Sequence, residues 1–367
     1  MTKKSDTPAI RFKGFTDTWE QRKAKDLCSI STGKSNTQDR VDDGIYPFYV
    51  RSPIVEHSNR YLFDEEAVLT VGDGVGTGKV FHYVNGKYDL HQRVYRMFDF
   101  SEEITAKYFY YYFSNHFYDR VMAMTAKTSV DSVRYEMIAE MDIALPKVKE
   151  QMAISAYFDR LDHLITLHQR KYDKLTNVKK SMLEKMFPKN GSNVPEIRFK
   201  GFTEAWEQRK LGDIASDMVA GGDIDKDLIL AEGQYPVIAN ALTGDGIVGY
   251  YDKEYRVNAP AVTVTGRGDV GHAKARLVNF TPVVRLLSVK SEHDVFFLEN
   301  AINTLKIVIE STGVPQLTVP QLAKYEVAFP RQLDEEEHIG VFFKQLDNLI
   351  TLHQRKWKRI NFAVHTD

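Results

Sequence analysis

The chain has 367 residues, of which 43% are hydrophobic, 12% aromatic and 27% charged. It is therefore longer than one typical domain of roughly 100 to 200 residues, and its composition excludes an intrinsically disordered or low-complexity protein. Lys and Arg number 49 against 50 Asp and Glu, so no overall basic surface is expected, and any binding to nucleic acid must be local or shared with a partner.

The N-terminus and the cysteine content predict where the protein works. Residues 1–11 have no apolar core, and no run of 18 apolar residues occurs elsewhere, so we expect neither an export signal nor a membrane span. Cys28 is the only cysteine. This excludes an internal disulfide or a thiolate metal cluster and suits a reducing compartment, so we expect a cytoplasmic protein.

The residue pattern in the first part of the chain predicts short strands followed by two helices. Stretches rich in Val, Tyr, Phe and Thr, broken by Gly, Asn, Asp and Pro, predict strands at 67–71, 79–84 and 93–98. The pattern at 104–118 predicts a helix. After a proline at 146, a helical pattern runs without a break over 148–187, roughly 60 Å at about 1.5 Å per residue.

Residues three and four apart along this long helix are mainly apolar, as the seam of a coiled coil requires. A second helix near the C-terminus has a matching pattern, and two such helices most simply pack against each other. The predicted seam contains Leu161, Ile165, His168, Tyr172, Leu346, Ile350, His353 and Trp357. The two histidines occupy equivalent positions, where a polar residue fixes the register or, alternatively, binds a metal or a proton.

The chain is an internal repeat of one unit of about 170 residues. The interiors of the two copies differ in length and residue type while their ends agree, which predicts a shared scaffold with two different recognition surfaces. The matching segments are IRFKGFT at 10–16 and 197–203, WEQRK at 19–23 and 206–210, and the helical sequences at 158–171 and 343–356.

In the second copy we expect strands at 261–265 and 282–289 and a helix at 297–311. Residues 266–271 match G-x-G-x-x-G, but the counterpart beginning at Gly72 loses the spacing, so no dinucleotide site is predicted. These glycines either let the backbone approach a phosphate or a groove, or they form a hairpin.

The sequence lacks the common catalytic motifs that we searched for. The chain contains no Asp/Glu-x-Lys tripeptide of metal-dependent nucleases, no Asn/Asp-Pro-Pro-aromatic motif of amino-methyltransferases, no His-Glu-x-x-His and no Gly-x-Ser-x-Gly. We therefore predict a binding protein, with no catalytic residue, no metal site and no cofactor of its own. A free-standing nuclease is nearly excluded.

The chain resembles the specificity (S) subunit of Type I restriction-modification systems over nearly all of its length. The resemblance is carried by Phe12-Lys13-Gly14-Phe15 with Trp19-Glu20, by their copies at 199–202 and 206–207, and by the Leu-Asp-x-Leu-Ile-Thr-Leu-His helices. It implies a mixed α/β (α+β) fold in which two tandem target-recognition globules are joined by two long helices forming an antiparallel coiled coil, with a pseudo-twofold internal repeat.

The resemblance also implies the organisation and the partners. We expect a first target-recognition domain at 10–147, a central helical spacer at 148–190, a second target-recognition domain at 197–331 and a short C-terminal helical region at 332–367. Each globule would read one part of a bipartite double-stranded DNA site. Two modification subunits would bind S-adenosylmethionine and methylate adenine, and restriction subunits with ATP and Mg would cut foreign DNA in a bacterial or archaeal cytoplasm.

Base-reading candidates are polar residues in the divergent interiors, because Arg can bind guanine and Asn or Gln can bind adenine. They are Arg51, Lys79, His91, Gln92, Arg93 and Lys127 in the first copy and Asn240, Arg267, Lys274, Arg276 and Gln316 in the second. An alternative function is a two-domain protein-binding adaptor or inhibitor that acts through its coiled coil without reading DNA.

Overall fold

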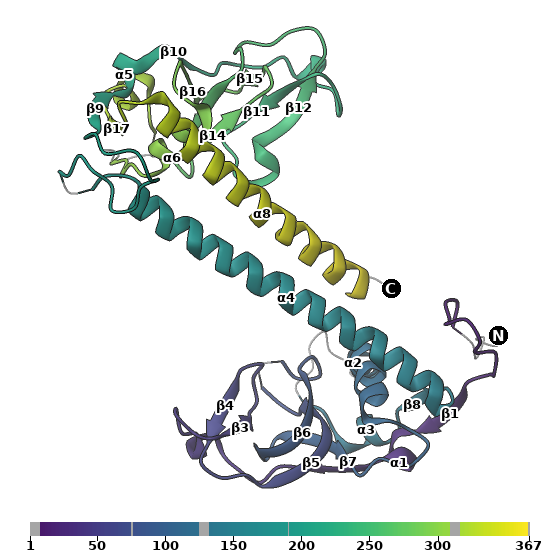
Figure 1. The fold of residues 1–367 in the computed structure, drawn as a ribbon. Helices are drawn as coiled ribbons and strands as arrows, with labels where there is room; N and C mark the ends of the chain where they lie inside the picture. The colour runs from purple at the N-terminus through teal and green to yellow at the C-terminus, as the bar shows by residue number, and fades with distance from the viewer. Residues whose placement is uncertain (1–7, 75, 125–131, 190, 309–315, 366–367) are drawn as a thin grey trace. The chain divides into compact units, whose positions relative to one another are not determined.

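The computed structural model describes residues 8–74, 76–124, 132–189, 191–308 and 316–365. The chain forms two compact units, residues 1–164 and 165–367, which Figure 1 colours from purple to teal and from teal to yellow. The boundary lies inside the long helix α4, Val148–Met186, so this helix contributes residues to both units. Among the described residues, no helix is long and apolar enough to cross a membrane.

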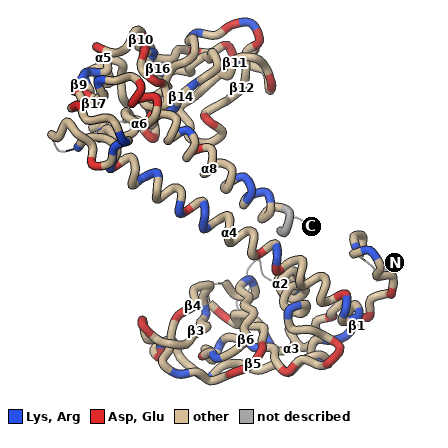
Figure 2. The backbone as a smooth tube through the Cα atoms, viewed as in Figure 1, with Lys and Arg blue, Asp and Glu red and all other residues tan. Residues whose placement is uncertain are grey.

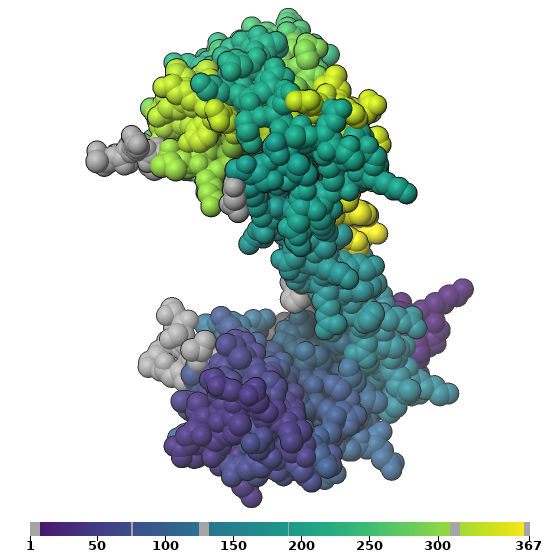
Figure 3. Space-filling view, turned by 60° about the vertical axis from the view of Figure 1, so that its left-hand side comes forward, coloured from purple at the N-terminus to yellow at the C-terminus, as the bar shows by residue number. Residues whose placement is uncertain are grey.

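The first unit is built on a six-stranded sheet in the order β2-β7-β5-β6-β3-β4. Its segments pack as one continuous body in the space-filling view (Figure 3). Its elements before α4 are β1 (Glu20–Lys23), α1 (Ala24–Leu27), β2 (Ser29–Thr32), η1 (Thr37–Asp39), β3 (Tyr46–Tyr49), β4 (Val55–Ser58), β5 (Phe63–Val71), β6 (Phe81–Leu90), β7 (Val94–Phe98), α2 (Ala106–Met124), α3 (Tyr135–Ala139) and β8 (Asp142–Leu145).

Helix α2 packs on this sheet through one aromatic face. Phe109, Phe113 and Phe117 recur every four residues, so they lie on one side of the helix, and all three are fully buried. Neighbouring rings stack with centroids 5.3 Å and 4.3 Å apart. The edges of Phe113 and Phe117 meet Phe81 of strand β6, which fixes the helix on the sheet.

In the second unit the corresponding strands form two sheets, in the orders β10-β16-β13-β14 and β12-β11-β15. The long strand β6 of the first unit corresponds to two short strands here, β14 and β15, which explains the division. The elements are β9 (Glu207–Lys210), α5 (Leu211–Ile214), β10 (Ala215–Ala220), η2 (Lys226–Leu228), β11 (Tyr235–Ile238), η3 (Thr243–Gly246), β12 (Ile247–Tyr251), β13 (Ala261–Thr265), β14 (Ala273–Arg276), β15 (Thr281–Pro282), β16 (Leu286–Ser291), α6 (Val295–Asn303), α7 (Val319–Leu322), β17 (Glu326–Phe329) and α8 (Leu333–His365).

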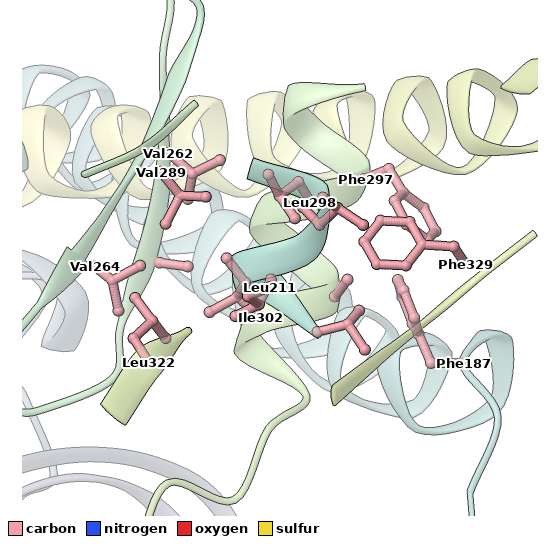
Figure 4. Packing of buried hydrophobic residues seen from close by; sticks show 14 of the residues in the cluster. Phe187, Leu211, Val262, Val264, Val289, Phe297, Leu298, Ile302, Leu322 and Phe329 are labelled. Carbon is pink, nitrogen blue, oxygen red and sulfur yellow. The ribbon is translucent and has the colours of Figure 1, made fainter. Parts of the chain in front are cut away.

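The core of the second unit joins its sheet to the end of α4 (Figure 4). Phe187, directly after α4, is buried and packs against Trp206, Phe297 and Phe343, with ring centroids 5.5 to 6.1 Å apart. Leu211 of α5 lies in the same cluster. The tryptophan of WEQRK packs in both copies, since Trp206 is a core residue of the second unit and the half-buried Trp19 packs against the core of the first.

The repeated ends of each copy bind each other. In the first unit EQRK forms β1 and pairs antiparallel with β8, and in the second unit the same letters form β9 and pair with β17. Arg11 donates two hydrogen bonds of 2.7 Å to Glu150, and Arg198 donates bonds of 2.6 and 2.7 Å to Glu335. Both carboxylates are buried in the first turn of a long helix. The repeated ends therefore close each unit, and we call the ion pairs Arg11–Glu150 and Arg198–Glu335 the Arg-Glu clasps.

Within the second unit, α8 runs antiparallel to the C-terminal half of α4. Nδ1 of His168 lies 2.9 Å from Nδ1 of His353, and Lys179 donates hydrogen bonds of 2.6 and 2.8 Å to Asp347. Residue numbers rise along one helix as they fall along the other at these contacts. The described residues contain no group of three His, Cys, Asp or Glu side chains suited to a metal. A hydrogen-bonded histidine pair that fixes the register is the interpretation that these contacts support.

This histidine pair predicts a loss of stability in acid. Burial lowers the pKa of His168 and of His353 below the ordinary value of 6.5, and the charges of Lys171 and Lys356 add to the effect. The unfolded chain therefore binds more protons just below pH 6.5, and stability falls as the pH decreases. The melting temperature should drop between pH 7.5 and 5.5 by more in the wild type than in the double variant His168→Leu, His353→Leu. Equal drops would contradict this prediction.

The structure confirms most predicted elements and corrects two. Helix α4 has 39 residues, close to the predicted span, and α8 has 33. The strand predicted at 282–289 is wrong because Arg285 has φ +71°, and a turn from Val283 to Leu286 separates β15 from β16. The helix predicted at 297–311 ends earlier, at Asn303, whose side-chain amide makes hydrogen bonds of 2.9 and 3.1 Å with the backbone of Ala273.

Both glycine-rich loops are hairpin connections. The loop from Gly72 joins antiparallel neighbours β5 and β6, and the loop from Gly266 joins antiparallel neighbours β13 and β14. A dinucleotide fingerprint needs a helix after its glycines, and a strand follows in both places. The structure therefore confirms that these loops are hairpins, and the approach of their backbone to a phosphate or a groove stays a prediction.

Candidate nucleic-acid interface

The ends of the hairpin loops are held in the same way in both units. The N–H of Val133 donates to the carbonyl of Gly72 at 2.7 Å, and the N–H of Leu317 donates to that of Gly266 at 2.9 Å. The next residue of each loop forms an isolated antiparallel bridge, Asp73 with Ser132 and Arg267 with Gln316. The two copies therefore present equivalent backbone positions that carry different side chains.

Strand geometry extends this correspondence to further residues. Strand β3 (YPFY) pairs parallel with β6 in the first unit, and strand β11 (YPVI) pairs parallel with β15 in the second, so β3 and β11 occupy equivalent positions. Two residues after them stand Arg51 and Asn240. Strands β7 and β16 begin directly after Arg93 and Arg285. The hairpin loop, the residues after β3 or β11 and those before β7 or β16 meet at one place in each unit.

We call the group in the first unit the first loop cluster: Arg51, Asp73, His91, Gln92 and Arg93. Asp73 lies 3.5 Å from Arg51 and 3.8 Å from Arg93. His91 is buried, and its Nδ1 accepts a hydrogen bond of 3.0 Å from the N–H of Arg93. Burial lowers the pKa of His91, and the charges of Arg51 and Arg93 lower it further. His91 is therefore a neutral support for the loop that presents Gln92 and Arg93.

Gln92 is the amide member of this cluster. Its Nε2 donates to Oδ1 of the exposed Asn36 at 2.6 Å, and its backbone N–H donates to Ser35. The N–H of Asn36 in turn donates to Asp39 at 2.8 Å in a capping box at η1. Two exposed amides are thus held side by side, and they are the groups that match the donor and acceptor of adenine in the major groove.

The second loop cluster consists of Asn240, Arg267, Arg285 and Gln316. Asn240 accepts a hydrogen bond of 2.8 Å from the N–H of Gly266 and donates one of 3.1 Å to the carbonyl of Val284. Both ends of its amide bind backbone, so it supports the loops rather than presenting donors. Arg267 and Gln316 are exposed on the bridged strands, and Arg285 is half-buried.

Other candidates have their partners outside the two clusters. Nζ of Lys79 sits 4.4 Å from the ring centre of Tyr118 on α2. Lys274 pairs with Asp245 at 3.0 Å, and Arg276 donates to Thr263 at 3.0 Å. Burial lowers the pKa of Arg276. Lys127 lies outside the described residues.

Sequence reasoning missed three features of the structure: Asp73 and Arg285 in the loop clusters, and the Arg-Glu clasps. The alignment of Gly72-Asp73-Gly74 with Gly266-Arg267-Gly268 already contained the reversal of charge at the middle position. Arg285 could have been found by aligning the strand that follows it with the one that follows Arg93. No local pattern marked the clasps, because their partners lie 139 and 137 residues apart.

The predicted seam residues lie partly buried along the helices. Ile165, His168 and Tyr172 of α4 are half-buried within the second unit, as are Ile350, His353 and Trp357 of α8, and Leu346 is buried. Leu161 is half-buried within the first unit. Positive and negative charges are interspersed along most of the chain (Figure 2), but the end of α8 carries basic residues, Arg355, Lys356, Lys358 and Arg359, and no acidic residue from 348 to 365.

These features define a protein of two related globular units that carry different polar loop clusters on one scaffold. The family model of the Type I restriction modification DNA specificity domain matches residues 16–177 and 203–361, one match in each copy. The chain belongs to this family. It is a DNA-specificity subunit of a Type I restriction-modification system, and it directs partner enzyme subunits rather than catalysing a reaction itself.

Individual relatives agree with this assignment. A protein named as a type I specificity subunit of Mycoplasma pneumoniae, S.MpnORF507P, is 26% identical over 326 residues, covering 86% of each chain. The specificity subunit of the EcoDI enzyme of Escherichia coli is 26% identical over 183 residues, 49% of this chain and 40% of the relative. The crystal structure of an S subunit from M. genitalium has the same fold, with a TM-score of 0.71 at 15% identity and coverage of 98% and 97%.

Proposed function

We propose that each loop cluster reads one half of a bipartite double-stranded DNA site. The observation that carries this proposal is the change of side chains at equivalent positions: Arg51 and Asp73 in one unit correspond to Asn240 and Arg267 in the other, while Arg93 and Arg285 are of the same type. The two units share one scaffold but present different hydrogen-bonding groups. This difference suits the reading of two different sequences, because base edges are distinguished by their donors and acceptors.

The proposal includes the partners. Two modification subunits bind the subunit and supply S-adenosylmethionine for adenine methylation, and restriction subunits supply ATP- and Mg-dependent cleavage. The net charge of −1 supports shared DNA binding, because phosphate contacts provide much of the affinity and the partners would contribute them. The complex would work in the cytoplasm of a bacterium or an archaeon.

Methylome sequencing tests this function directly. The chain is expressed with its cognate modification subunits in a host that lacks other adenine methyltransferases. The expected result is one methylated motif with two defined parts and an undefined spacer. An active complex that methylates a continuous motif, or methylates without sequence preference, would refute the bipartite reading.

The purified chain by itself should neither methylate nor cut DNA. The motifs for both reactions are missing from its sequence, so S-adenosylmethionine, ATP and Mg should leave a DNA substrate unchanged. Transfer of labelled methyl groups and cleavage of a plasmid are the two measurements. The control is the same preparation supplemented with the modification subunits. Either activity in a preparation that mass spectrometry shows to be free of other subunits would contradict this prediction.

A further inference from the structure

The first loop cluster holds two arginines on one carboxylate. Nη1 of Arg51 lies 3.5 Å from Oδ1 of Asp73, and Nε of Arg93 lies 3.8 Å from Oδ2. These distances are longer than charge-assisted hydrogen bonds, so the carboxylate balances both charges while the guanidinium donors stay available. The side chains of Arg51 and Arg93 are 48% and 66% exposed, which leaves them open to a ligand.

The surroundings keep this arrangement in place. The N–H of Arg93 is bound by His91 at 3.0 Å, and the carbonyl of Arg93 accepts from the N–H of Gly72 at 2.8 Å. Oδ1 of Asp73 is buried and accepts no hydrogen bond from the described residues. The two arginines are therefore its ion-pair partners, and two guanidinium groups on one carboxylate would repel each other without it.

We propose that Arg51 and Arg93 read guanine in the half-site of the first unit and that Asp73 is the positioning residue for both. This inference rests on the proposed function. The planar fork of arginine matches O6 and N7 of guanine, and this is the commonest specific contact in the major groove. The second loop cluster has Arg267 in place of Asp73 and a backbone-bound Asn240 in place of Arg51. The arrangement of two arginines on one acid thus belongs to the first unit.

The test uses the full chain assembled with its modification subunits, after its methylated motif has been determined. Duplexes carry 7-deazaguanine in place of one guanine of the first half-site at a time, which removes N7 and leaves base pairing intact. Dissociation constants come from fluorescence anisotropy. The wild-type complex should bind at least one such duplex about tenfold more weakly than the unmodified site.

The arginine variants identify the side chain that makes the contact. With Arg51→Met or Arg93→Met, which remove the guanidinium donors, the penalty for 7-deazaguanine at one position should disappear. The matched control is Arg22→Met at an exposed arginine on strand β1 of the same unit, 45% exposed, which should keep the full penalty. Variants of both cluster arginines that keep the penalty would show that neither arginine contacts N7, and the inference would be wrong.

Asp73→Asn separates positioning from folding. Loss of the carboxylate removes one negative charge and leaves the two arginine charges unbalanced, so affinity for a duplex without the site should rise while preference for the true site falls about tenfold. A misfolded unit would lose both affinities. If Asp73→Asn does not fold, the two methionine variants decide the question, since they retain the carboxylate of Asp73.

Two outcomes distinguish a failure of the guanine reading from a failure of the proposed function. A bipartite motif whose first half contains no guanine on either strand would overturn the guanine reading and leave the proposed function standing. Absence of any bipartite motif in an active complex would overturn the proposed function and the guanine reading with it.

Discussion

Replacing residues 24–144 with the same region of another type I specificity subunit is expected to change one half of the methylated motif completely and leave the other half unchanged. The segment begins at α1, immediately after the repeated strand β1, and ends inside β8. It contains the first loop cluster and the whole six-stranded sheet, while the clasp between Arg11 and Glu150 stays outside it. The new interior should therefore fold between unchanged scaffold ends.

The matched exchange uses residues 211–328, which correspond to the same elements from α5 to β17 in the second unit. It should change the opposite half of the motif. Methylome sequencing of both chimaeras, each expressed with the modification subunits, reads the two halves independently. A change in both halves from either single exchange would show that the units do not read DNA separately.

Loss of the clasp in the second unit should destabilise that unit strongly. Glu335 is 1% exposed and binds Arg198, which is 11% exposed, through two hydrogen bonds. Glu335→Ala removes one partner and leaves the guanidinium charge buried without compensation. Breaking a buried pair in this way costs about 3–5 kcal/mol, whereas an exposed pair contributes about 0–1 kcal/mol. Chemical unfolding monitored by circular dichroism measures the loss.

Glu337→Ala is the control, because Glu337 lies in the same helical turn, carries the same charge and is exposed. Its free energy of unfolding should stay within about 0.5 kcal/mol of the wild type. A second variant, Arg198→Met with Glu335→Leu, replaces both partners with apolar groups and should recover much of the stability. A loss below 1 kcal/mol for Glu335→Ala would mean that the clasp does not hold the unit together.

The sequence determined the architecture through its repeats and periodicity. The recurrence of IRFKGFT, WEQRK and the long helical pattern predicted two copies of one unit, and the predicted span 148–187 closely matches α4. Local pattern was sufficient here because a helix with apolar residues three and four apart must bury that side wherever it packs. The absence of catalytic motifs was likewise evident from the amino-acid sequence, and it agrees with the family to which the chain belongs.

Only the tertiary structure decided which of the candidate residues lie together. Arg51 and Arg93 meet at Asp73, and the buried His91 supports Arg93, whereas Lys274 and Arg276 bind Asp245 and Thr263, which are not members of the second loop cluster. From the sequence alone, all of these are polar residues in the divergent interiors, and those that lie together cannot be told from those that do not. Their roles depend on strand pairing across separations of 20 or more residues, and on turns such as the one at Arg285 that split a predicted strand. Such pairing depends on the packing of the whole sheet, because the same short apolar run can pair with several partners until the core selects one.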